Sequence, residues 1–197
     1  MCILCSSEPI EGDPRNDRQG KFTVDMMSAP KTDPGCCLAS CLCPCCAQIY
    51  IRRKALNYDM TKYSCCQGYM DGIMPCIKSG QCGEQSCPTC CLCLESFCCN
   101  GCAVSATRMM VMDRYDLRPD EMDNRIIRCN NCIQMFSVIC DCLAICITEL
   151  RDVAQILDCI AQCTYMSVQG CMTAQVNVEL NRREQYPPVA DEVMDRV

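Results

Sequence analysis

Residues 119–150 read PDEMDNRIIRCNNCIQMFSVICDCLAICITEL, and this stretch has the clearest structural pattern in the chain. Its apolar side chains recur at alternating spacings of four and three, which places them on one face of an α-helix. The stripe consists of Met122, Ile126, Cys129, Ile133, Phe136, Cys140, Leu143 and Ile147. Pro119 suits the first position of a helix, and the acidic residues that follow complement the helix dipole. The stretch therefore predicts one helix about 40 Å long at 1.5 Å per residue.

A second apolar stripe follows a bend predicted at residues 148–152. It consists of Leu150, Val153, Leu157 and Ile160, and it continues through Val168 and Cys171 toward Leu180. Two long helices joined by a short connection pack as an antiparallel hairpin. Cys129 and Cys140 lie on the first stripe, where a free cysteine behaves as a small hydrophobic side chain, so we expect both in the core.

Cysteine dominates the composition, with 27 cysteines in 197 residues and no histidine. About one residue in seven is cysteine, above the roughly 8–10% that marks chains held together by disulfides or metal. Without histidine, Ser-His and Cys-His catalysis are excluded. A bound metal must then be held mainly by thiolates, which select zinc, cuprous copper, cadmium or iron–sulfur. The sequence also has no phosphate loop or dinucleotide fingerprint, so we expect no enzymatic activity.

The state of the thiols follows from the expected compartment. The N-terminus lacks the basic and apolar segments of a secretory signal, which predicts an intracellular, reducing environment. An odd number of cysteines also cannot pair completely within one chain. Both observations favour thiolate–metal sites over a disulfide framework. The alternative is a partly oxidised structural or interaction subunit of a larger complex.

The segment from Cys36 to Cys102 holds 17 of the 27 cysteines. Six of them fall within residues 36–46, a density that core packing does not require. A Cys-x-x-Cys turn suits tetrahedral zinc because both sulfurs can reach one ion. The predicted zinc ligands are Cys36, Cys37, Cys41, Cys43, Cys45, Cys87, Cys90, Cys99 and Cys102, with Cys65, Cys66 and Cys76 as partners from the intervening loop. The number of ions and the pairing of ligands stay open.

Other cysteines admit two interpretations each. Cys129 and Cys132 have the Cys-x-x-Cys spacing of thiol redox motifs. In such motifs the start of a helix lowers the pKa of a thiol, whereas this pair lies inside the predicted helix. Cys159 and Cys163 are one helical turn apart, and they could share a metal or pack between helices. Cys2 and Cys5 are candidate S-acylation sites, since two lipid chains would anchor the protein stably, or they are surface thiols without a role.

The composition predicts a mainly α protein with one domain between two tails. A cysteine-rich, metal-stabilised half of loops and short helices would pack on the long two-helix hairpin. Short helices are expected near residues 46–58 and 104–115. The predicted ranges are 1–33 for a flexible N-terminal tail, 34–184 for the domain, with its halves at 34–103 and 104–184, and 185–197 for a C-terminal tail.

Charge and hydropathy limit the partners. A net charge of -6 argues against nucleic acid, which is bound by basic surfaces. The runs 36–51 and 133–148 are each about 16 residues, short of the roughly 20 that a membrane span needs. A buried or interfacial helix is therefore favoured over a span, and we expect a protein partner or oligomer, with a membrane surface as a second option. A protein that moves divalent metal across a membrane would need a true span.

Two short motifs flank the domain, CCLASCLCPC at 36–45 and CMTAQVNVEL at 171–180. A double cysteine followed by Cys-Pro-Cys, and a closing cysteine with Gln-x3-Glu-Leu, resemble the placenta-specific-8 domain family, which includes plant cell-number regulators and cadmium-resistance proteins. Ala174 stands where the family has a second cysteine, and the dense block 82–102 exceeds the family's middle pair, as in a divergent member. The resemblance, over residues 22–182, implies membrane association and a non-catalytic role in divalent-metal tolerance or cell number.

Overall fold

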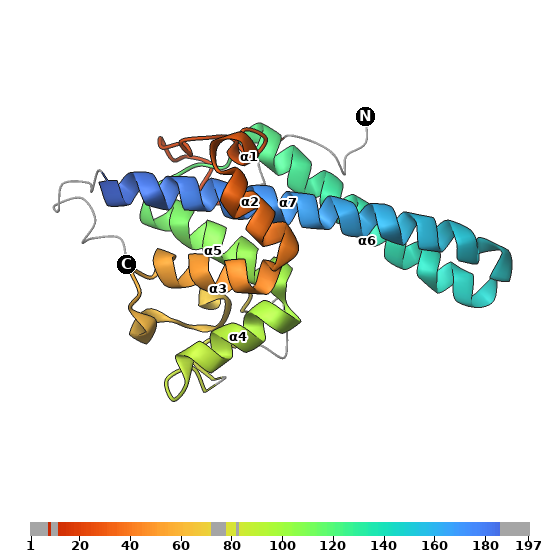
Figure 1. Ribbon diagram of the computed structural model, residues 1–197, viewed down its shortest axis with the longest axis horizontal. Helices are drawn as coiled ribbons and strands as arrows, with labels where there is room; N and C mark the ends of the chain where they lie inside the picture. Colours follow the sequence, from red (N-terminus) through yellow and green to blue (C-terminus); the bar gives the residue numbers. More distant parts are fainter. Residues whose placement is uncertain (1–7, 9–11, 72–77, 82, 186–197) are drawn as a thin grey trace.

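Seven α-helices form the fold in the computed structural model, which describes residues 8, 12–71, 78–81 and 83–185 (Figure 1). Those residues contain no β-strand, so the predicted mainly α class is confirmed. The helices are α1 (Ala29–Thr32), α2 (Pro34–Leu42), α3 (Pro44–Ala55), α4 (Pro88–Cys98), α5 (Asn100–Arg114), α6 (Glu121–Cys146) and α7 (Arg151–Gln185). Short 3₁₀ turns lie at η2 (Met60–Lys62), η3 (Cys65–Gly68) and η4 (Thr148–Leu150).

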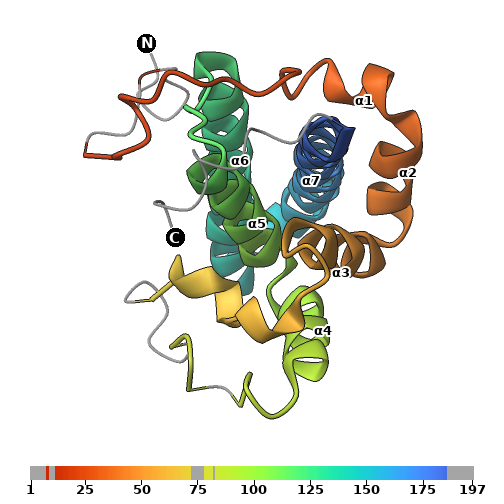
Figure 2. The same ribbon diagram turned by 90° about the vertical axis from the view of Figure 1, so that its left-hand side faces the viewer.

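The predicted hairpin of two long helices is confirmed as α6 and α7. Asp120 caps α6 by accepting a hydrogen bond from the backbone N–H of Met122 at 3.0 Å. The bend falls at η4, inside the segment that the sequence marks for it. Helix α7 continues for 35 residues, and the other helices pack around its second half (Figures 1 and 2). It lies between α5 and α6 on one side and α1 and α2 on the other (Figure 2).

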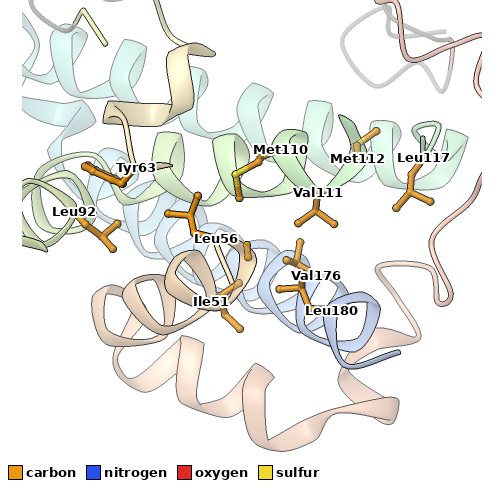
Figure 3. Close-up of a cluster of buried hydrophobic side chains, with 11 residues drawn as sticks. Ile51, Leu56, Tyr63, Leu92, Met110, Val111, Met112, Leu117, Val176 and Leu180 are labelled. Atoms are coloured by element: carbon orange, nitrogen blue, oxygen red, sulfur yellow. The ribbon is translucent and has the colours of Figure 1, made fainter. Parts of the chain in front are cut away.

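The short helices and the hairpin share one apolar core (Figure 3). It is built from all parts of the chain: Ile51 and Leu56 at the end of α3, Tyr63, Leu92 of α4, Met110, Val111 and Met112 of α5, Leu117, and Val176 and Leu180 of α7. Three of the short helices, α2, α3 and α4, begin at a proline. Proline is favoured at the first helical position because a backbone N–H there would have no acceptor within the helix, so its absence costs no hydrogen bond. Packing on α7 therefore holds the cysteine-rich half to the helical half.

Residues 12–33 pack against the helices, although their composition predicts a flexible tail. Thr23 donates to Glu179 from its backbone N–H at 2.8 Å and from its hydroxyl at 2.6 Å. Gln175 donates to the carbonyl of Val24 at 3.0 Å. Glu179 and Gln175 are both fully buried on α7, so the N-terminal segment supplies partners for side chains that would otherwise be buried without them.

The apolar stripe of α6 is not its buried face. Phe136 and Leu143 are 48% and 46% exposed, and Cys129 and Cys140 are only half-buried, so the expected core stripe is wrong for α6. The residues of α6 that are buried are Asp123, Asn130, Cys132 and Ser137. Toward the tip, α7 presents buried alanines and a hydrogen-bonding backbone to α6, which explains the buried polar residues there. Near the start of α6, Ile126 and Ile127 pack against the apolar cluster that includes Val168 and Met172 of α7. Periodicity identified the helix but not its inner face.

Candidate metal centre

Three buried metal-ligating side chains meet where η3 contacts α4. The sulfurs of Cys65 and Cys66 and a carboxylate oxygen of Glu95 all lie within 4.8 Å of one another. Cys66 is fully buried, and the other two are less than a tenth exposed. Within the described ranges, these residues form the one group of three or more such donors that lies this close together. We call this group the Cys65–Cys66–Glu95 cluster.

A strained turn brings the two adjacent cysteines to this position. Cys66 and Gln67 have φ values of 46° and 48°, in the left-handed region that non-glycine residues rarely adopt. Two buried glutamates hold the turn: the N–H of Cys65 donates to Glu84, and the N–H of Cys66 donates to Glu95 at 2.9 Å. Strain of this kind persists only where the surroundings fix it, and it concentrates at functional sites.

Glu95 is held by three donors. Its Oε1 accepts from Nη2 of Arg52 at 2.9 Å, and its Oε2 accepts from the hydroxyl of Tyr63 at 2.7 Å and from the N–H of Cys66. The Arg52 side chain is fully buried, so the ion pair is shielded from solvent. Burial, followed by the charge of Glu95, raises the pKa of Tyr63, which keeps its hydroxyl a donor. The carboxylate therefore has one fixed orientation.

The charges around the cluster fit a bound cation. Burial raises the pKa of Cys66, with further contributions from Glu95 and Cys65, so without a cation its thiol stays protonated. Glu84 is buried, and its Oε2 has no hydrogen-bond partner among the described residues. Arg52 pairs with Glu95 alone, so Glu84 is a second buried carboxylate beside the cluster, without a cationic partner of its own in the part of the chain that the structure describes. A divalent cation would offset this excess of negative charge and favour thiolates over thiols.

A third thiol adjoins the cluster. Cys102, in the first turn of α5, packs against the buried pair Cys65 and Cys66. Burial raises its pKa, and the neighbouring Cys99 and Glu95 raise it further. Cys99 is the residue that precedes α5, at its N-cap. Cys102 of the predicted unit Cys99–Cys102 therefore lies beside the cluster.

The predicted ligands of α2 face a different partner. Cys37 and Cys41 lie against α7, where Cys171 hydrogen-bonds Cys37. Gly170 allows this contact, since a Cβ there would lie 2.9 Å from Sγ of Cys41 and 3.4 Å from Sγ of Cys37. Cys36 lies on the same helix, and burial, then Asp33, raises its pKa to about 11. The sequence did not pair these thiols with Cys171, because the pairing depends on how α2 crosses α7.

The remaining predicted ligands are nearer to solvent. Cys43 and Cys87 precede the prolines that start α3 and α4, and both are exposed. Hydrogen bonds from Cys46 lower the pKa of Cys43, and Cys90 lowers that of Cys87 in the same way. Cys45 is half-buried near Tyr165. Among the residues that the structure describes, none of these belongs to a close group of three donors.

Three of the predicted positions lie outside the described residues, namely Cys2, Cys5 and Cys76. Sequence reasoning placed Cys65 and Cys66 only as accessory partners, and it missed Glu95, Glu84 and Arg52. The doubled cysteine was the signal available for the first two. No sequence signal separates Glu95 from the other acidic residues of the chain, because its role comes from burial.

Comparison with known proteins adds no relative. No family model, no curated protein and no solved structure matches the chain.

Proposed function

We propose that the protein is a non-catalytic, cysteine-rich protein that binds structural zinc and acts at a membrane surface or in an assembly. Cys65, Cys66 and Cys102 would supply thiolates, and Glu95 the fourth donor. The observation that carries the proposal is the buried cluster, with donor atoms within 4.8 Å of one another. Three thiolates and a carboxylate suit tetrahedral zinc. The burial argues for a structural ion, since a catalytic one keeps a position open to substrate.

The resemblance to the placenta-specific-8 domain family gives this proposal further support, which comes from the closing motif at residues 171–180. Its closing motif includes Gln175 and Glu179, which are fully buried and bind the N-terminal segment at Thr23 and Val24. The motif thus has a structural use in this chain. A family role in divalent-metal tolerance agrees with a thiolate site, and a link to metal handling remains part of the proposal.

Cobalt binding tests the assignment. We expect the metal-free protein to bind Co²⁺ and develop thiolate charge-transfer absorption, which Cys66→Ser and Cys102→Ser should each reduce by about a third or more because each removes one of the three thiolates. Cys159→Ser is the matched control, since Cys159 is exposed on the hairpin and far from the cluster, and it should leave the spectrum unchanged. An unchanged spectrum in the first two variants would refute the site. It would favour the alternative, a structural subunit with no role in metal handling.

A further inference from the structure

The outer halves of α6 and α7 project beyond the rest of the protein (Figure 1). There each helix packs on the other, while the remaining helices surround only the second half of α7 (Figures 1 and 2). We call the part from Ile133 of α6 to Thr164 of α7 the projecting hairpin. In that part of α7, Ala154 and Ala161 are the buried residues. Most of the hairpin surface therefore has no protein cover.

The polarity of the projecting hairpin is the reverse of that of a soluble helix pair. Its interior is hydrogen-bonded: Gln134 donates to the carbonyl of Ala161 at 2.7 Å, and Ser137 donates to Asp158. Its outer surface is mainly apolar, with side chains 44% to 83% exposed at Phe136, Val138, Ile139, Leu143, Ile145, Val153, Ile156 and Ile160. The exposed Asp141, Gln155 and Gln162 are polar exceptions on this surface. A helix pair in water turns its apolar side chains inward, whereas a pair in lipid satisfies its polar groups internally.

The length and charge of the hairpin match a bilayer. Residues 129–148 contain one charged residue, Asp141, and span about 29 Å, close to the roughly 30 Å of a hydrocarbon core. Residues 133–148, the part within the projecting hairpin, span about 23 Å of this length. Residues 153–178 of α7 also contain one charged residue, Asp158. These two carboxyl groups are hydrogen-bonded to each other across the two helices, with Asp141 exposed and Asp158 half-buried. Arg128 precedes this stretch of α6, and Glu149 follows it at the tip.

We propose that the projecting hairpin inserts into the hydrocarbon of a lipid bilayer, with its charged tip at the far headgroups and the other helices on the near side. Helix α6 is long and apolar enough to cross a membrane, and only 17% of its apolar stretch is buried, unlike a core helix. The sequence favoured a buried or interfacial helix because the run 133–148 alone is short; α6 adds a full turn of uncharged residues before it. A protein partner would cover one face of the hairpin. The exposed apolar side chains lie on both helices, which fits lipid around the hairpin better. The inference rests on the membrane part of the proposed function and is independent of the metal centre.

A single tryptophan tests insertion, because the chain has none. Phe136→Trp places the probe on the exposed face of α6. With vesicles of brominated phosphatidylcholine, we expect its emission to shift to the blue and to be quenched. Tyr58→Trp is the control, since Tyr58 is 55% exposed just after α3, at the end of that helix that points away from the hairpin (Figure 1). Its emission should be unaffected by the vesicles.

A lysine in the middle of the apolar stretch of α6, residues 129–148, provides the second test. Val138 is 61% exposed, so Val138→Lys should fold, but we expect its partitioning into phosphatidylcholine vesicles to fall about 100-fold because lysine at a span centre is costly. Tyr58→Lys adds the same charge elsewhere and should partition like the original chain. Both lysine variants should bind Co²⁺ normally, which separates a failure of this inference from a failure of the zinc site.

Three results would overturn the inference. Phe136→Trp emission that ignores the vesicles would show that the hairpin stays outside lipid. Equal quenching in Phe136→Trp and Tyr58→Trp would show adsorption of the whole protein. A blue shift without vesicles, together with a doubled mass in solution, would show that a second copy covers the hairpin.

Discussion

Removal of zinc is expected to unfold the cysteine-rich half, residues 34–103, with loss of much of the helical signal from α2, α3 and α4. In small zinc domains the metal contributes about 10–16 kcal/mol of apparent binding free energy, which appears as folding free energy. Here the loss would leave two buried carboxylates, Glu84 and Glu95, of which Glu95 is paired with the guanidinium of Arg52. The strained turn at Cys66 would then lose the bonds from its sulfurs to the metal. Circular dichroism after treatment with a strong chelator measures this effect.

The appropriate control is the same chelator loaded with zinc beforehand, which should leave the spectrum intact. Restoring zinc to the stripped protein under reducing conditions should bring back the helical signal. The hairpin should lose less signal, since its hydrogen bonds, such as that from Gln134 to the carbonyl of Ala161, do not involve the metal cluster. A full spectrum in the stripped protein would mean that packing alone holds this half.

Arg52→Met is expected to lower the free energy of unfolding by about 3–5 kcal/mol, because it leaves Glu95 charged and buried without its partner. Arg52 is fully buried, and it also donates to the carbonyl of Ala103 at 3.1 Å, so it joins α3, α4 and α5. Methionine keeps most of the side-chain volume and removes the charge. Urea unfolding of the zinc-loaded protein provides the measurement.

The neighbouring Arg53→Met is the matched control, since Arg53 is exposed on the same helix, and we expect a change within about 0.5 kcal/mol. Equal losses for the two arginine variants would mean that the buried ion pair does not stabilise the fold.

The hairpin was predictable nearly to the residue because its signals are local. Pro119 and Asp120 mark its start, and the four–three spacing persists to the bend at η4. The inner face of α6 was not predictable by the same rule, because the rule assumes that apolar side chains turn away from water. Asp123 and Ser137 are buried instead, through bonds to Arg108 and Asp158 that form only when the helices pack.

The candidate site was predictable only in part. Thiolate ligands followed from the cysteine count and the missing histidine, and Cys102 was among the predicted ligands. Cys66 reaches the cluster through a left-handed backbone that its sequence does not indicate. Arg52 and Glu95 are 43 residues apart and become partners through the packing of α3 against α4. Contacts of this length depend on the whole fold, so spacing rules do not reveal them.

The most direct test of the zinc site is elemental analysis of the intact protein, purified without chelator and under reducing conditions. The buried cluster of Cys65, Cys66 and Glu95, with Cys102 beside it, predicts at least one zinc ion per chain. A protein that contains no zinc or other thiolate-binding metal, yet keeps its full helical spectrum, would contradict the proposed metal centre.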